Sequence, residues 1–305
     1  MKLALKVDVD TLDGTRTGVP KLMSLFDRHG VRATFLFSLG PDHTGRALKR
    51  IFRPGFFKKV RRTSVVSHYG LKTLLYGTLL PGPDIAGKTA DVMRSVAAAG
   101  HEVGVHTFDH VLWQDRVAGA GDAWTKAQLQ LACARFADVF GRPATVHGAA
   151  GWQMNPHAYR AEADLGFRYA SDGRGRSPYR PLVEGELAGC VQLPTTLPTL
   201  DELIGRDDLP QGTPEASLTA ATERGSDFGH VFTLHAEIEG GQLCSAFDGL
   251  LSVWRAQGYS LGTLETSFTG LDPATIPACH ATYGTVPGRS GRLAIQGDAV
   301  RELRG

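Results

Sequence analysis

Apolar and polar positions along the chain change period repeatedly, and each change predicts a strand or a helix. Residues 3–9 and 31–38 are rich in strand-forming apolar side chains, whereas 19–28 has apolar residues at helical spacing. After an interruption at about 41–83 the alternation resumes, with helices predicted at 90–99, 124–140, 156–165, 217–223 and 246–257, and strands at 102–105, 144–147, 167–170, 190–193, 230–235 and near Ser260. The pattern therefore predicts about seven β/α units.

Repeated β/α units without a Gly-rich nucleotide-binding turn favour an α/β fold with a closed or nearly closed barrel over a doubly wound open sheet. In such barrels the chemistry lies at the carboxyl ends of the strands. The residues predicted there are Asp8, Asp10, His106, His110, Ala149 to Trp152, Ser171, Asp172 and His235.

The composition is that of an ordinary globular protein, with 42% apolar and 21% charged residues in 305. A formal net charge of +2 indicates no nucleic-acid partner, and no segment indicates an obligate protein partner. The four cysteines form no CxxC pair, which favours free thiols in a reducing compartment. The first apolar run is too short for a signal peptide, and no stretch reaches the roughly 20 apolar residues of a spanning helix, so we expect any membrane contact to be peripheral.

Two carboxylates close the first predicted strand, in the sequence Asp8-Val9-Asp10. Strand alternation points both to the same side, where they repel unless a cation or a proton separates them. A metal ion explains the pair, although a turn in which one aspartate caps a loop is the alternative.

His106 and His110 lie four residues apart in HTFDH, a spacing that brings both imidazoles to one face if the segment is helical. Two histidines with one carboxylate leave coordination positions for water and substrate, as in catalytic metal sites. Ordinary surface or core histidines without a metal are the alternative. His235 ends a β-rich run and is a candidate general acid, or an ordinary hydrogen-bonded histidine.

Read in order, these residues resemble the polysaccharide deacetylase family, also called the NodB-homology or carbohydrate esterase family 4 fold, over about 1–265. The first motif is DVD at 8–10, the second is H-[ST]-x-x-H at 106–110, preceded by GHEVG, and the last is Leu234-His235. The third motif, which normally carries Arg and Pro before an aromatic residue, is replaced by AAGW at 149–152. The resemblance implies a distorted (β/α)7 barrel and leaves open which residue partners the base.

One branch of that family resembles this chain more closely, namely the 4-deoxy-4-formamido-L-arabinose-phosphoundecaprenol deformylases of lipid A modification. Four segments carry the likeness: DVDTLDGTRTGVP at 8–20, AAGW with the later SDGRG at 171–175, LPTTLPTLDELIGRD at 193–207, and HAEIEG at 235–240. The likeness implies removal of a formyl group from an undecaprenyl-phosphate-linked amino sugar at the cytoplasmic face of the bacterial inner membrane, in the aminoarabinose modification that confers polymyxin resistance.

Residues 46–62 contain eight lysines and arginines, six large apolar residues and no acidic residue. Such a basic, amphipathic stretch suits an anionic lipid interface, and apolar residues continue to about Leu80. We therefore expect residues 46–80, within a helical insertion at about 41–88 that follows the second strand, to contact the membrane surface. A solvated charge run is the alternative.

The expected mechanism assigns a divalent metal (zinc, cobalt or manganese) to Asp10, His106 and His110. Asp8 acts as the base and His235 protonates the leaving amine. A backbone N–H near Gly151 stabilises the oxyanion, and Trp152, Asp172 and Arg174 bind substrate, with Arg174 a candidate contact for the sugar phosphate or a surface arginine. The alternatives are another carbohydrate N-deacetylase of the family, or an inactive binder of lipid-linked sugar. The deacylase domain is expected at 1–270, with a flexible tail at 271–305.

Overall fold

Strands with uninterrupted apolar runs form the centre of the molecule, because a parallel sheet is covered on both faces. The computed structural model describes residues 1–47 and 75–300. Its main sheet has eight strands, all paired in parallel, in the order β10-β1-β2-β3-β4-β5-β8, with β9 also paired to β1. The strands are β1 (Lys2–Val9), β2 (Thr34–Ser38), β3 (Glu102–Thr107), β4 (Val146–His147), β5 (Tyr169–Ala170), β8 (Val191–Gln192), β9 (His230–His235) and β10 (Ser260–Gly262).

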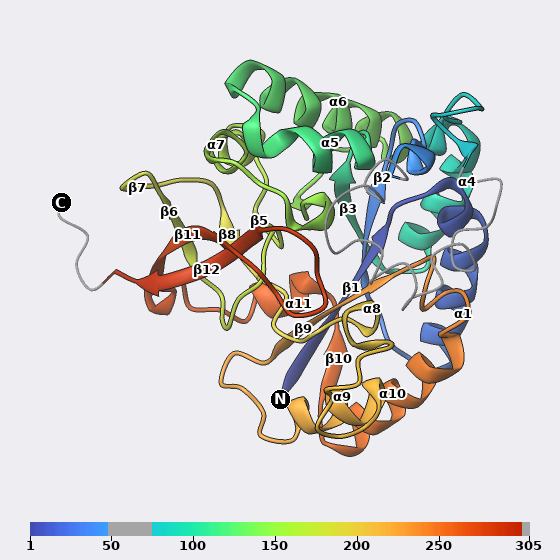
Figure 1. The fold of residues 1–305 in the computed structure, drawn as a ribbon, viewed down its shortest axis with the longest axis vertical. Helices are drawn as coiled ribbons and strands as arrows, with labels where there is room; N and C mark the ends of the chain where they lie inside the picture. Colours follow the sequence, from blue (N-terminus) through green and yellow to red (C-terminus); the bar gives the residue numbers. More distant parts are fainter. Residues whose placement is uncertain (48–74, 301–305) are drawn as a thin grey trace.

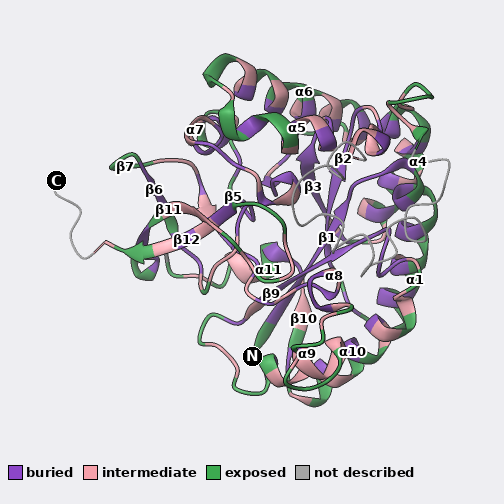
Figure 2. Ribbon diagram, viewed as in Figure 1, coloured by how far each residue is buried: buried purple, intermediate pink, exposed green. Residues whose placement is uncertain are grey.

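Helices surround this sheet, and Figure 1 shows them on the outside of the curled strands. They are α1 (Val19–Arg28), α4 (Ile85–Ala98), α5 (His110–Arg116), α6 (Asp122–Phe140), α7 (Pro156–Asp164), α8 (Leu200–Leu203), α9 (Pro214–Thr222), α10 (Cys244–Ala256) and α11 (Leu264–Phe268). Figure 2 shows that burial concentrates on the central strands and on the helix faces turned toward them. The strands of the main sheet and helices α1, α4, α6, α7, α9 and α10 agree with those predicted from the apolar pattern, whereas the shorter helices α5, α8 and α11 were not predicted.

The chain after β8 nearly closes the barrel against β9. The backbone N–H of Thr196 donates to Val231 O at 3.0 Å, and the hydroxyls of Thr195 and Thr233 lie 2.6 Å apart. The expected barrel of parallel strands is therefore confirmed, with an irregular segment in place of continuous pairing at this seam.

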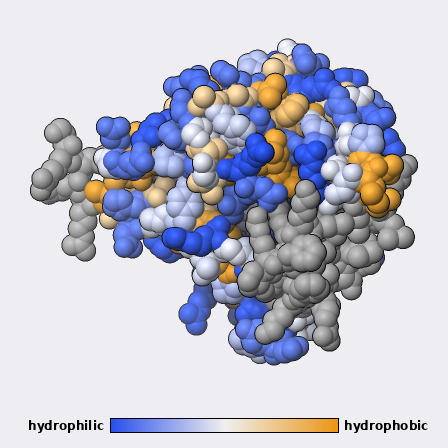
Figure 3. Space-filling view, turned by 45° about the horizontal axis from the view of Figure 1, so that its top comes forward, coloured by the Kyte–Doolittle hydropathy of each residue, from blue (hydrophilic) through white to orange (hydrophobic). Residues whose placement is uncertain are grey.

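The two ends of the insertion after β2 lie side by side. Pro41 and Asp84 form an antiparallel bridge, and the N–H of Gly45 donates to Tyr76 O at 2.9 Å. Most of the stretch expected to contact the membrane lies outside the described residues. In the described part, Leu79 is 81% exposed. Figure 3 shows one face of the molecule, where hydrophobic areas lie separated among hydrophilic residues.

The C-terminal residues differ from the expectation of a flexible tail. β11 (Ala278–Gly284) and β12 (Leu293–Ala299) pair with each other and join β6 (Arg180–Val183) and β7 (Glu186–Leu187) in a second sheet of four strands. The Gly-rich sequence TVPGRSGR connects β11 to β12, so its glycines serve a hairpin rather than a loose end. Figure 1 shows this sheet beside the barrel, near β5 and β8.

No helix among residues 1–47 and 75–300 is both long and apolar enough to cross a bilayer.

Candidate metal centre and active site

Three side chains from two neighbouring parts of the barrel meet at the carboxyl ends of the strands. Asp10 follows β1, His106 lies near the end of β3, and His110 is the first residue of α5. The Nε2 atom of His106 lies 3.2 Å from Oδ1 of Asp10, and that of His110 lies 3.3 Å from Oδ2. The structure therefore brings together all three predicted metal ligands, Asp10, His106 and His110, which are called the metal triad below.

The segment that carries the two histidines is not a single helix, so the condition for a shared helix face is not met. His106 is in a strand and His110 begins a helix, so a turn between them, not a shared helix face, brings the rings to 5.3 Å between centroids. Asp109 holds that turn: its Oδ1 accepts from the N–H of Leu112 at 3.0 Å and its Oδ2 lies 2.6 Å from Nδ1 of His43. This cap fixes the start of α5 and with it His110.

The hydrogen bonds around His106 fit a cation between it and Asp10. The Nδ1 atom of His106 lies 2.6 Å from Gly148 O and donates to it, which leaves Nε2 of the neutral ring as an acceptor. This acceptor faces Oδ1 of Asp10, a buried carboxylate oxygen without a hydrogen bond. A cation or a proton between these two atoms would satisfy both. Ligands at 2.0–2.1 Å from a tetrahedral zinc lie about 3.3 Å apart, as these atoms do.

The surroundings of Asp10 favour the charged form of its carboxyl, which is the form that binds a metal. Burial raises the pKa of its carboxyl, but the neighbouring His110, His106 and His235 lower it by more, so the pKa of Asp10 lies well below its usual range. Glu237 holds the backbone at this point, because its Oε1 accepts from the N–H groups of Asp10 and Thr11 at 3.0 and 2.8 Å. Sequence reasoning missed Glu237, and its position in HAEIEG two residues after His235 was the available signal.

Asp8 and His235 lie side by side on β1 and β9, where they are paired in register. Oδ1 of Asp8 is buried without a hydrogen bond and lies 3.9 Å from Nδ1 of His106. Nδ1 of His235 is also buried without a hydrogen bond, while its backbone N–H donates to Glu239 Oε2 at 2.7 Å. Both predicted catalytic side chains therefore lie next to the metal triad, and each has one buried polar atom without a hydrogen bond.

A second cluster of possible ligands lies deeper, formed by His147, Glu162 and Asp172. Nδ1 of His147 lies 2.6 Å from Glu162 Oε1 and 2.9 Å from Asp172 Oδ1, which are hydrogen-bond distances. Although burial lowers it, Asp172 and Glu162 together raise the pKa of His147 to about 10. Burial and Asp172 raise the pKa of Glu162 well above its usual value. We interpret this cluster as a proton-sharing network, not a metal site.

Asp172 was expected to bind substrate, but its side chain is completely buried in this network. Its Oδ1 accepts from the N–H of Ala149 at 2.8 Å, and Oδ2 accepts from Gln192 at 2.8 Å. Asp172 therefore holds the segment whose Gly148 carbonyl orients His106, and acts at a distance from any substrate.

Gly151 and Trp152 form a strained turn, η5 (Ala150–Trp152), with φ values of +60° and +54°. The positive φ at Gly151 favours glycine, and a Cβ there would also have to displace the end of Gln114, whose Nε2 would lie 2.3 Å away. Strained backbone of this kind is typical of functional sites. The turn begins one residue after Ala149, whose N–H donates to Asp172, and it contains Gly151, near which the oxyanion donor is expected.

Trp152 is buried beneath two arginines. The guanidinium carbons of Arg174 and Arg289 lie 5.1 and 4.5 Å from its ring centroid. Arg174, expected to contact the sugar phosphate, forms an ion pair with Glu202 at 2.5 Å, and Glu202 also accepts from Arg289 at 3.0 Å. Arg289 comes from the hairpin that was expected to be flexible, so sequence reasoning could not place it here.

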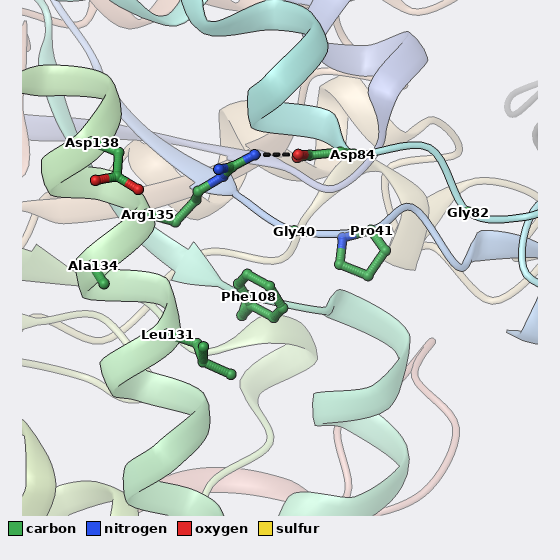
Figure 4. A pocket seen from close by; sticks show the side chains of 9 residues that line it. All are labelled: Gly40, Pro41, Gly82, Asp84, Phe108, Leu131, Ala134, Arg135 and Asp138. Atoms are coloured by element: carbon green, nitrogen blue, oxygen red, sulfur yellow. Dashed lines mark hydrogen bonds and ion pairs between the residues drawn. The ribbon is translucent and has the colours of Figure 1, made fainter.

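A cavity of about 430 Å³ lies beside α6, where the insertion joins the barrel (Figure 4). Phe108 of HTFDH, Leu131 and Ala134 give it apolar walls, and the ion pair between Arg135 and Asp84 borders it. None of its lining residues belongs to the metal triad.

A curled parallel barrel with two aspartates and three histidines gathered at its strand ends has the architecture of a barrel hydrolase. Residues 6–170 match the family described as polysaccharide deacetylase. The chain is 38% identical over 250 residues to a probable 4-deoxy-4-formamido-L-arabinose-phosphoundecaprenol deformylase ArnD of Shewanella sediminis, covering 82% of this chain and 80% of that protein. A protein with the same name from Wigglesworthia glossinidia brevipalpis is 29% identical over 289 residues, covering 94% of this chain and all of that protein.

The solved structure of a probable polysaccharide deacetylase from Pseudomonas aeruginosa has the same fold, with a TM-score of 0.58, 15% identity, and coverage of 87% of this chain and 89% of that one. The chain belongs to the polysaccharide deacetylase family, and it is an amide hydrolase.

Proposed function

We propose that this chain removes the N-formyl group from 4-deoxy-4-formamido-L-arabinose-phosphoundecaprenol, in the modification of lipid A with aminoarabinose. The observation that carries the proposal is the likeness to deformylases over most of the chain, combined with a complete set of hydrolytic groups at the strand ends. A relative that had lost its activity would have no reason to keep Asp8, Asp10, both histidines of the triad and His235 together.

The proposed mechanism divides the work among the chain's own residues. A divalent ion bound by Asp10, His106 and His110 supplies Lewis acidity for the water and the formyl carbonyl. Asp8 takes a proton from the attacking water, and His235 gives a proton to the departing amine nitrogen. The backbone near Gly151 donates to the developing oxyanion. Water adds to the formyl carbon, the C–N bond breaks, and formate and a free amine leave.

Metal removal is expected to abolish formate release. Protein stripped of metal and then loaded with zinc, cobalt or manganese is incubated with formamido-arabinose-phosphoundecaprenol, or with a short-prenyl analogue, and formate is measured. We expect no release from the stripped protein and recovery with at least one metal, since the triad leaves positions open for water and substrate.

An acetylated sugar and an acetylated oligosaccharide are the matched control substrates. A preference for either over the formamido lipid would contradict the deformylase proposal and favour another N-deacetylase. Binding of the formamido lipid without turnover at any metal would favour an inactive binder.

We also propose that residues 46–80 hold the protein at the cytoplasmic face of the inner membrane. Lys58, Lys59, Arg61 and Arg62 are replaced together by alanine, and binding to vesicles containing anionic phospholipid is measured by sedimentation. Each basic residue near the surface contributes on the order of 1 kcal/mol, so the affinity should fall about 10³-fold at low salt and by less at high salt.

The control variant removes the same number of exposed basic residues elsewhere, namely Lys21, Arg94, Arg224 and Arg255. Equal losses in the two variants would show that net charge alone, and not residues 46–80, drives the binding.

A further inference from the structure

Lys6 is a fully buried cation in the middle of β1. An ammonium group is very unfavourable in a protein interior unless it is paired and hydrogen-bonded. The Nζ atom of Lys6 meets both conditions: it lies 3.2 Å from Oδ2 of Asp8 and donates to Ser171 O at 3.1 Å. It also lies 5.6 Å from the centroid of the Trp152 ring. Its partners come from β1, from the segment after β5 and from η5.

Strand alternation places Lys6 directly beneath Asp8. Residues 6 and 8 of β1, and residue 10 just after it, lie on the same side of the strand. Lys6, Asp8 and Asp10 therefore form a column that ends at the metal triad. Asp8 lies between a cation below and the triad above. Its Oδ2 is held by Lys6, whereas its Oδ1 makes no hydrogen bond and lies on the side of His106.

The surroundings of Lys6 are shaped to receive its side chain. A Cβ at Gly148 would lie 3.1 Å from Cε of Lys6, so the missing side chain at that position makes room for the lysine stem. The neighbouring positions of β1 on the other face are apolar and buried. Replacing a buried ion pair by apolar residues often leaves stability unchanged or improves it, so stability alone does not account for a lysine here.

We propose that Lys6 is a positioning residue that orients the carboxylate of Asp8 for its role as the base. The proposal rests on the proposed function only in taking Asp8 as the base. Lys6 holds Oδ2 of Asp8, and this leaves Oδ1 on the side of His106, where it can take the proton from the attacking water. AAGW at 149–152 carries no cation to do this, and the lysine two residues before Asp8 reaches the same carboxylate from below.

The test is a double-mutant cycle between Lys6→Met and Asp8→Asn, with kcat and KM for formate release, zinc content and melting temperature measured for each protein. Removing a group that orients another typically lowers activity about 10–100-fold, so Lys6→Met should lower kcat by that factor with KM and zinc content little changed. The double variant should be no slower than Asp8→Asn alone, because a residue that acts through Asp8 has nothing to act on without it. Lys6→Arg should recover part of the activity.

Lys2→Met is the matched control, since Lys2 lies on the same side of β1 at its exposed start, and it should leave kcat unchanged. Effects of Lys6→Met and Asp8→Asn that multiply in the double variant would overturn the proposal, as would a crystal structure of Lys6→Met with the Asp8 carboxylate unmoved. This structural test needs no substrate, so its outcome does not depend on which N-acyl sugar the protein hydrolyses. If the wild-type protein hydrolyses a different N-acyl sugar, the deformylase proposal fails and the same cycle on that substrate still tests Lys6.

Discussion

Replacing His106 by alanine is expected to remove the metal ion and to lower formate release about 10³-fold or more. The metal's charge stabilisation of a carbonyl oxygen is worth several kcal/mol, and each 1.4 kcal/mol changes the rate tenfold. In the proposed site His106 is one of three protein ligands, and its ring is held in place by Gly148 O. The measurement is zinc content after dialysis, together with the rate of formate release.

Glu162→Gln is the matched control, because Glu162 belongs to the second cluster of possible ligands. The pKa of Glu162 is raised well above its usual value, which favours its neutral form, and glutamine has nearly the same shape as the carboxyl. We expect this variant to keep its zinc and most of its activity. Loss of zinc from Glu162→Gln with retention in His106→Ala would place the metal in the deeper cluster and contradict our assignment.

Long apolar runs were easy to predict because one physical pattern determines them. β9 begins and ends at the predicted residues, since the apolar stretch at 230–235 stops at His235. β6, β7, β11 and β12 were not predicted, because they are short or rich in polar residues and glycine and are stabilised by pairing between distant segments. No local pattern distinguishes such strands from loops.

The sequence predicted which residues lie at the site better than it predicted how their side chains are arranged. Strand ends located Asp172 correctly, but sequence position does not say that its carboxylate turns inward to His147. Lys6 was overlooked as a single charge in an apolar strand, although its alternation with Asp8 and Asp10 places all three on one side. Arg289 and Glu202 reach Trp152 only through tertiary packing.

Asp8→Asn is expected to keep the metal and to lower kcat by about 10²–10⁴-fold, the usual contribution of a general base. Asparagine has the same shape as aspartate and its oxygen still accepts from Lys6, but its amide takes no proton from water. The measurement is kcat for formate release by protein whose zinc content equals that of the wild type. Near-full activity with zinc bound would contradict the assignment of Asp8 as the base.

The same substitution at Asp10 separates the two aspartates of DVD. Asp10 faces two imidazoles, with its hydrogen-bond-free Oδ1 next to His106 and its Oδ2 next to His110, whereas Oδ2 of Asp8 faces Lys6. Asp10→Asn should therefore lose zinc, and added zinc should restore part of its activity, whereas Asp8→Asn should hold zinc and gain nothing from more. Loss of zinc from Asp8→Asn would instead make Asp8 a ligand. We therefore expect two carboxylates that lie two residues apart to have different roles, because the barrel gives them different neighbours.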